Sequence, residues 1–278
     1  MAAYSGPCPA AVGATTLVPM QDEGVLFEVD GMESVAVERD RCWPGLDVTF
    51  DVYSPPEAAV RPAVLFVHGD APPERLRNLK EHPQYTSWGR LVASSGMVAV
   101  TFNRRSTEGG VRVAEAEAEV RGMLAGMREH GPAHGIDPNR LAVWVCSAGP
   151  PTVVPMLLRE QPPFVRCLVV YYGLLDVPDA PLYSAVAALE GAAEVNAIPP
   201  ILVVRAGRDR PLFLASTDRF VSAALSRNIP LEVVNHPEGE HAFDLRTDTR
   251  RTREAITRTL EFLRWHLVDG LEPHAGCG

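Results

Sequence analysis

The most constraining feature of the sequence is a short apolar run that ends in a serine and is followed by a glycine. It reads Leu-Ala-Val-Trp-Val-Cys-Ser-Ala-Gly over residues 141–149, and a stretch typical of a helix follows at 152–158. A strand that turns sharply into a helix at a serine is the arrangement of a nucleophile elbow, Gly-x-Ser-x-Gly. Such a turn raises the serine oxygen above the sheet, where a histidine can reach it and the N–H groups of the new helix can face a developing oxyanion. Ser147 is therefore the candidate nucleophile.

One position departs from that pattern, because Val145 stands where the first glycine is expected. Glycine is typical there because the tight turn brings the flanking backbone close together. A valine must crowd the turn or line the pocket beside it, and the sequence leaves both possibilities open. An ordinary helix N-cap serine would fit the same residues equally well. Cys146 would have no glycine at either flanking position of the pattern, so we reject it as the nucleophile.

Composition excludes several classes of function. The chain has 278 residues, of which 46% are hydrophobic and 22% charged, as in a soluble globular enzyme. The net charge of −9 argues against nucleic acid and anionic membrane as partners. The cysteines have no metal-ligand spacing, and we expect neither a metal nor a cofactor. No apolar run approaches the ~20 residues of a membrane span and no targeting segment is evident, so a cytoplasmic protein is expected. Lys80 is the only lysine.

Strand-like and helix-like stretches alternate from about residue 30 onward, which predicts one doubly wound α/β domain. We expect an N-terminal arm over residues 1–30, a catalytic domain over 31–278, and within it an insert at 174–200 that could form a small cap. Near-continuous apolar runs indicate parallel strands with helices on both faces. Eight strands are predicted, with an antiparallel start, at 34–38, 46–53, 63–68, 97–102, 141–146, 165–172, 201–206 and 231–235. Helices are predicted at 84–95, 111–130, 152–159, 212–227 and 248–267.

Three reactive residues each follow a predicted strand, where ligands bind in open α/β sheets. They are Ser147, Asp209 and His241, and the order Ser, Asp, His is that of the α/β-hydrolase arrangement. A histidine would take the serine proton, and an aspartate would hold the histidine in the correct tautomer. Asp176 is a rival acid one strand earlier, and His236 is a rival base at the end of the last strand. We favour Asp209 and His241.

The same logic predicts an oxyanion hole made of backbone N–H groups. One donor is expected at Ala148, the residue after the nucleophile. The second is expected in the loop after the predicted strand 63–68, at Gly69 and Asp70. A carboxylate aimed into the hole would oppose the oxyanion, so the Asp70 side chain should turn away while its N–H points in.

These stretches together resemble an α/β-hydrolase of the dienelactone-hydrolase and small-carboxylesterase branch, which shares its catalytic domain with prolyl-oligopeptidase-type peptidases. The resemblance covers residues ~45–267 and implies an α/β-hydrolase fold, with Ser147, Asp209 and His241 as the triad and backbone donors at Gly69–Asp70 and Ala148. Dienelactone hydrolases proper use a cysteine nucleophile. The matching stretches are LDVTFDVY (46–53), AVLFVHG (63–69), GIDPNR (135–140), SAG (147–149), AGRD (206–209) and GEHAF (239–243).

Some positions depart from the family pattern. Besides Val145, Asp70 stands where a second glycine is common, and Pro150 and Pro151 open the helix after the elbow. Prolines in a first helical turn remove only N–H groups that lack intrahelical partners. Pro155 lies one turn further along and should kink or shorten this helix.

The sequence therefore predicts a serine hydrolase that cleaves a small-molecule carboxylic ester through an acyl-enzyme. Arg104, Tyr171, Tyr172 and the insert at 174–200 are candidates for the substrate pocket, and a structural role for Arg104 is the competing interpretation. Two other functions stay open, a peptidase or amidase on the same triad and a non-catalytic binding protein with a spoiled elbow. A homodimer is also left open.

Overall fold

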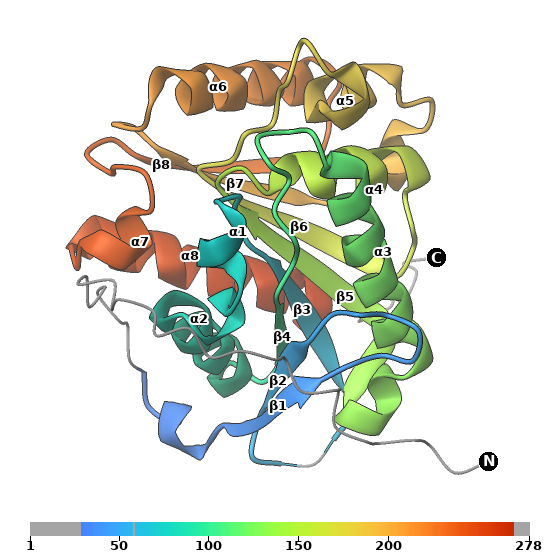
Figure 1. Ribbon diagram of the computed structural model, residues 1–278. Coiled ribbons are helices and arrows are strands. Elements are labelled where there is room, and N and C mark those ends of the chain that lie inside the picture. The colour runs from blue at the N-terminus through green and yellow to red at the C-terminus, as the bar shows by residue number, and fades with distance from the viewer. Residues whose placement is uncertain (1–28, 58, 270–278) are drawn as a thin grey trace, which may run out of the picture.

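The computed structural model describes residues 29–57 and 59–269. The predicted arm at 1–30 and the end of the predicted domain lie almost entirely outside these residues. Figure 1 shows a central twisted sheet with helices on both of its faces. The sheet has eight strands in the order β1-β2-β4-β3-β5-β6-β7-β8. The predicted eight-stranded α/β architecture is confirmed.

The strands pair as the sequence predicts, with an antiparallel start and a parallel remainder. β1 pairs with β2 and β2 with β4 in antiparallel fashion, whereas every later pair is parallel. The carboxyl ends of β3 and β5 to β8 therefore share one edge of the sheet. The strands are β1 (Ala36–Arg41), β2 (Phe50–Ser54), β3 (Arg61–Val67), β4 (Val98–Phe102), β5 (Ile136–Cys146), β6 (Val165–Tyr171), β7 (Ile201–Ala206) and β8 (Leu231–His236).

Two layers of helices cover the sheet, and each layer seals one hydrophobic core. α3, α4, α5 and α6 share a core with one face, while α2, α7 and α8 share a core with the other. Within the described residues, no helix is both long and apolar enough to cross a membrane. The helices are α1 (Pro73–Leu76), α2 (Pro83–Ser94), α3 (Val113–Glu129), α4 (Val154–Glu160), α5 (Ala185–Gly191), α6 (Pro211–Ser226), α7 (Phe243–Arg246) and α8 (Arg250–Leu267). Short 3₁₀ turns lie at Met32–Ser34, Leu79–Glu81, Gly131–His134, Pro150–Thr152, Pro181–Tyr183 and Val195–Ala197.

Several predicted boundaries are wrong. The strand predicted from residue 46 begins at Phe50, and β5 begins at Ile136 rather than at residue 141. The helix predicted from residue 152 is divided into a 3₁₀ turn at Pro150–Thr152 and a helix from Val154. Pro155 is at the start of α4, where its missing N–H costs no intrahelical bond, so it shortens the helix as expected.

The segment between β6 and β7 contains the predicted insert at 174–200. Its helix α5 packs against α4 and α6 and buries Ala185, Ala188 and Leu189 in the core of that layer. The segment begins beside the candidate nucleophile, because the N–H of Leu174 donates to the carbonyl oxygen of Ser147 at 2.8 Å. A cap role for the rest of the insert stays a prediction.

An ion cluster around a buried lysine joins the antiparallel edge of the sheet to the segment before α2. The Lys80 side chain is 1% exposed, and its Nζ lies 2.8 Å from Oδ1 of both Asp40 and Asp51 and 3.3 Å from Glu81 Oε1. Asp51, on β2, is fully buried and also accepts from Arg39 at 2.9 Å. The sole lysine of the chain is therefore committed to holding the fold together.

Candidate active site

The turn after β5 has the geometry expected of an elbow. Ser147 adopts a left-handed backbone conformation with φ of 56°, which is uncommon for a residue other than glycine. Its N–H donates to the Tyr171 carbonyl oxygen at 3.0 Å, and the N–H of Gly149 donates to the Cys146 carbonyl oxygen at 2.9 Å. These bonds hold the serine at the carboxyl end of the sheet.

Val145 is accommodated by the glycine on the other side of the elbow. Its side chain is fully buried in the core beneath α3 to α6. A Cβ placed on Gly149 would lie 2.7 Å from Val145 Cγ2 and 2.7 Å from the His68 carbonyl oxygen. Gly149 is therefore required for close approach, and it leaves the room that Val145 needs.

The three predicted residues meet at this edge of the sheet. Ser147 Oγ lies 2.7 Å from His241 Nε2. The other ring nitrogen, Nδ1, lies 2.8 Å and 2.9 Å from the two carboxylate oxygens of Asp209. Because a carboxylate can only accept here, Nδ1 carries a proton and Nε2 is free to accept the serine proton. The arrangement can remove a proton from Ser147 and return it to a leaving group.

The rival acid and base are bound elsewhere. Asp176 accepts from Arg219 Nε at 2.5 Å and from Ser184 Oγ at 2.7 Å. His236 is buried, its Nε2 lies 3.2 Å from Thr252 Oγ1, and its ring packs on Phe243. Burial lowers the pKa of His236 below the ordinary value, which further opposes a role as a base. Neither contacts Ser147.

Cys146 is a buried strand residue. Its Sγ lies 3.3 Å from the Tyr85 hydroxyl, and burial raises the pKa of the thiol to about 11. A thiol that is protonated at neutral pH is a poor nucleophile.

The loop after β3 passes directly beside the serine. A Cβ on Gly69 would lie 2.7 Å from Ser147 Cβ and 3.1 Å from Ser147 Oγ, so only glycine fits at this position. Ala148, whose N–H is the other expected donor, is the residue directly after Ser147. The predicted oxyanion loop and the nucleophile are therefore adjacent, as a hole built from both would require.

A buried arginine holds this loop from behind. Arg104 is 1% exposed, and its Nη2 donates to the Gly69 carbonyl oxygen at 3.1 Å and to the His68 carbonyl oxygen at 3.4 Å. Nη1 donates to the Arg105 carbonyl oxygen at 2.8 Å. Its buried guanidinium binds backbone carbonyls, which favours the structural interpretation of Arg104, and a place in the substrate pocket stays a prediction.

His68 completes this support as a neutral imidazole. Nδ1 donates to the Gly69 carbonyl oxygen at 2.7 Å, and Nε2 accepts the N–H of Arg104 at 3.0 Å. Burial, together with the positive charge of Arg104, lowers the pKa of His68 to about 3.

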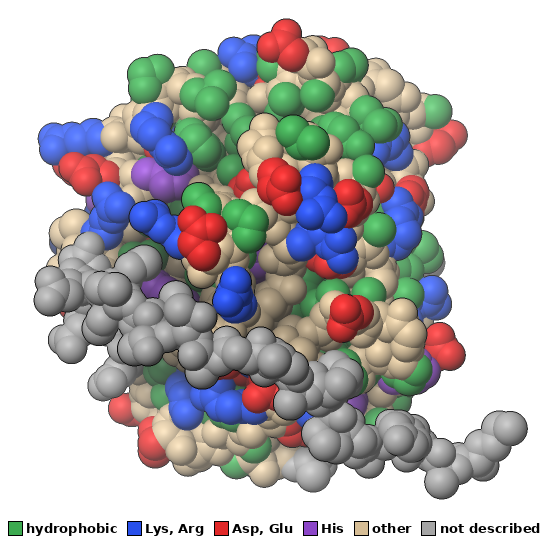
Figure 2. Space-filling view, in the orientation of Figure 1, with side chains coloured by type: hydrophobic (Ala, Val, Ile, Leu, Met, Phe, Trp, Pro, Cys, Tyr) green, Lys and Arg blue, Asp and Glu red, His purple; other side chains and the backbone are tan. Residues whose placement is uncertain are grey.

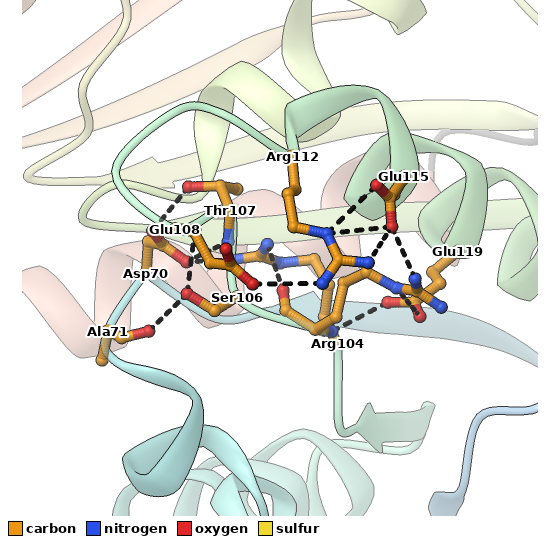
Figure 3. Close-up of polar contacts among 10 residues, drawn as sticks. Asp70, Ala71, Arg104, Ser106, Thr107, Glu108, Arg112, Glu115 and Glu119 are labelled. Carbon is orange, nitrogen blue, oxygen red and sulfur yellow. Dashed lines mark hydrogen bonds and ion pairs between the residues drawn. The ribbon is translucent and has the colours of Figure 1, made fainter.

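The Asp70 carboxylate turns away toward the loop between β4 and α3, as expected, and Figure 3 shows its partners. Oδ1 accepts the N–H of Thr107 at 2.8 Å, and Oδ2 accepts its hydroxyl at 2.5 Å. Arg104 Nη2 lies 3.6 Å from Oδ1, and Ser106 Oγ donates to the Ala71 carbonyl oxygen at 2.7 Å. The two loops are thereby held together, and a role for the Asp70 N–H in the oxyanion hole stays a prediction.

The two tyrosines predicted for the pocket are both buried at the carboxyl end of β6, and a role in the substrate pocket stays a prediction. Tyr171 is buried, and its hydroxyl lies 2.7 Å from Thr259 Oγ1 beneath α8. Tyr172 is buried beside the histidine, with ring centroids 4.9 Å apart, and its hydroxyl donates to Asp244 Oδ1 at 2.7 Å. Tyr171 is therefore a core residue, and Tyr172 supports one side of His241.

Sequence reasoning missed three contributors, namely Thr107, Asp244 and Arg210. Asp244 is buried and accepts from Tyr172, from Trp88 Nε1 at 3.1 Å and from Gln84 Nε2 at 2.9 Å; burial raises its pKa. Arg210 Nη2 lies 3.2 Å from His241 Nε2. A signal existed only for Arg210, which directly follows the predicted acid. Among the described residues, no group of three His, Cys, Asp or Glu side chains could hold a metal ion.

The low pKa of His68 predicts a loss of stability in acid. Between pH 6.5 and about 3 the unfolded chain binds a proton at this histidine and the folded chain does not, so the free energy of unfolding falls as pH falls. The slope is at most about 1.4 kcal/mol per pH unit. In His68→Gln, urea unfolding between pH 4 and 6 should show a slope shallower by up to this amount. Identical slopes in wild type and variant would contradict a neutral, buried His68.

No protein-family model matches the sequence, and no curated protein matches it. Solved structures do match. The crystal structure of DphMB1 has a TM-score of 0.64 at 22% identity, covering 87% of this chain and 88% of that one. Thermogutta terrifontis esterase 2 phosphorylated by paraoxon has a TM-score of 0.62 at 18% identity, covering 84% and 94%.

Another similar structure is that of an esterase rPPE mutant complexed with (S)-Ac-CPA. It has a TM-score of 0.67 at 17% identity, covering 87% of this chain and 86% of that one. These similarities extend over most of each chain and include named esterases. With the sheet order and the parallel pairing described above, they show that the chain has the α/β-hydrolase fold.

Proposed function

We propose that this protein is a serine hydrolase that cleaves a carboxylic ester through an acyl-enzyme on Ser147. The observation that carries the proposal is the relay from Ser147 Oγ to His241 Nε2 at 2.7 Å and from His241 Nδ1 to Asp209 at 2.8 Å. These contacts have the lengths that proton transfer requires. They join residues from three separate loops, and an ordinary helix N-cap has no need of them.

In the proposed reaction, His241 Nε2 takes the proton of Ser147 Oγ as the oxygen attacks the ester carbonyl. The oxyanion that forms is stabilised by the backbone N–H groups of Ala148 and Asp70. The imidazolium then donates its proton to the departing alcohol, and Asp209 stabilises the imidazolium. A water molecule, deprotonated by the same nitrogen, releases the acid from Ser147.

The proposal is supported by the activity that the names of several similar structures give. Several are esterases, and one of them, from Thermogutta terrifontis, was phosphorylated by the organophosphate paraoxon. We infer that the present chain also forms a covalent adduct with such reagents, at Ser147. The dienelactone-hydrolase branch remains part of the proposal on the sequence resemblance alone.

Covalent labelling tests the nucleophile. Wild type treated with paraoxon should gain the mass of one diethylphosphoryl group, and Ser147→Ala should gain none, because the attacking oxygen is gone. Intact-mass spectrometry reads both results, and Cys146→Ala is the matched control that should still label. An adduct that persists in Ser147→Ala would contradict the assignment, and no adduct with either protein would favour the non-catalytic alternative.

Replacing each candidate acid by asparagine distinguishes Asp209 from Asp176. Asp209→Asn should lower kcat for 4-nitrophenyl acetate by about 10⁴-fold, since His241 would lose the partner that fixes its tautomer. Asp176→Asn should lower kcat much less, because Asp176 contacts Arg219 and Ser184 instead. Circular dichroism checks that both variants are folded. A larger loss of kcat in Asp176→Asn would move the acid to the preceding strand.

The contact between Asp70 and Thr107 should affect kcat through the oxyanion loop. Thr107→Val keeps the shape and the backbone N–H bond but removes the hydroxyl bond to Asp70. Because losing a whole oxyanion donor costs about 10²–10³ in kcat, a loosened donor should cost about tenfold. KM should change little, and Thr107→Ser should restore kcat. Equal kcat in Val and Ser variants would mean that the hydroxyl does not position the loop.

A further inference from the structure

Arg210 places a positive charge at the reacting nitrogen of the candidate base. It directly follows Asp209 and is the N-cap residue of α6. Its side chain is 61% exposed, yet Nη2 lies 3.2 Å from His241 Nε2, the same nitrogen that is 2.7 Å from Ser147 Oγ. Figure 2 shows basic side chains gathered at the upper left of this face, the side on which the loops into α6 and α7 lie in Figure 1.

The guanidinium is held in place by aromatic contact and lacks a full ionic partner. It lies 4.2 Å from the centroid of the Phe213 ring, and the same ring packs edge-on against His241 with centroids 4.7 Å apart. Its closest carboxylate contact is 3.8 Å, from Nε to Asp209 Oδ1. That oxygen already accepts from the Arg210 N–H and from His241.

Several other exposed arginines of the described chain form close pairs with carboxylates. Arg205 binds Asp218 at 2.7 Å and Arg258 binds Glu232 at 2.5 Å. Glu240, next to His241 in sequence, lies 4.0 Å from Arg246. Among the described residues no carboxylate lies closer than 3.8 Å to the Arg210 guanidinium, so its donors remain available to a ligand beside His241. A planar fork of donors matches a carboxylate in two parallel hydrogen bonds.

The position of this cation favours a substrate that carries a negative charge of its own. When His241 takes the serine proton, an imidazolium forms within 3.2 Å of the guanidinium, and Asp209 and the oxyanion balance these two charges without forming a close hydrogen-bonded pair with the guanidinium. Nε2 also delivers the proton to the leaving alcohol, so the Arg210 fork faces the alcohol side of the ester rather than the acyl side. A carboxylate on the alcohol would neutralise the guanidinium and orient the leaving oxygen at Nε2.

We propose that Arg210 is a specificity-determining residue that binds a carboxylate on the alcohol portion of the ester, so that the preferred substrates are acyl esters of hydroxy acids. This inference rests on the proposed function. It adds the chemical class of the substrate, because hydrolysis would release a carboxylic acid and a hydroxy-carboxylate.

The experiment compares two esters of the same size. In 3-acetoxybenzoate the leaving alcohol carries a carboxylate, and in 3-acetoxybenzamide it carries a neutral amide. For wild type, kcat/KM should be at least tenfold higher for the anionic ester. In Arg210→Gln that ratio should fall at least tenfold, because the contact with the carboxylate is gone. Arg208→Gln removes the same charge from a neighbouring exposed position and should leave the ratio as in wild type.

Each contrary result has one meaning. A ratio that Arg210→Gln does not change, or that Arg208→Gln changes equally, overturns the role of Arg210 as a specific contact. A third ester, mono-4-nitrophenyl succinate compared with 4-nitrophenyl butyrate, carries its charge on the acyl side; an Arg210-dependent preference there alone overturns the assignment to the alcohol. If wild type hydrolyses neither acetoxy ester and paraoxon gives no adduct, the proposed function itself fails, and this inference with it.

Discussion

The loop after β3 passes Ser147 at a distance that leaves no space for a side chain. A Cβ on Gly69 would lie 2.7 Å from Ser147 Cβ, and one on Gly149 would lie 2.7 Å from the His68 carbonyl oxygen. The parallel pairing of Val67 with Val145 brings the two strand ends level, so the two loops leave the sheet side by side. This close approach is what brings candidate oxyanion donors near the nucleophile. It also fixes the position of Ser147, which the histidine and the aspartate must then reach.

The loop after β3 is held by polar contacts that are largely buried. Where the hydrolases that the sequence resembles commonly have a second glycine, this chain has Asp70, and the carboxylate is bound by Thr107 and lies near the Arg104 guanidinium. Arg104 in turn binds the carbonyls of His68 and Gly69, and it is almost fully buried. A glycine-rich loop is flexible in isolation. Here hydrogen bonds from the segment after β4 restrict the conformation of the loop.

The sequence was sufficient for the architecture and for the residues that react. Alternating apolar runs predicted all eight strands, and the positions of Ser147, Asp209 and His241 after their strands predicted that they would meet. The sequence did not predict the direction in which individual side chains point. Arg104 follows a strand, as a ligand-binding arginine would, but its direction depends on carbonyls that lie 35 residues away in the chain. Val145 departs from the elbow motif, but alternate side chains along β5 point to opposite faces of the sheet, and this alternation directs the Val145 side chain into the core.

The single lysine has a consequence for the chemistry of the surface. Because Lys80 is buried among Asp40, Asp51 and Glu81, the described surface carries no side-chain amine. All its permanent positive charge belongs to guanidinium groups, which do not lose their protons in proteins. A lysine-rich surface discharges in alkali, but this one keeps its cations, and the ion pairs among its side chains persist well above the pH at which ammonium pairs would dissolve. Acylating and cross-linking reagents that seek lysine would likewise find no side chain on it to react with.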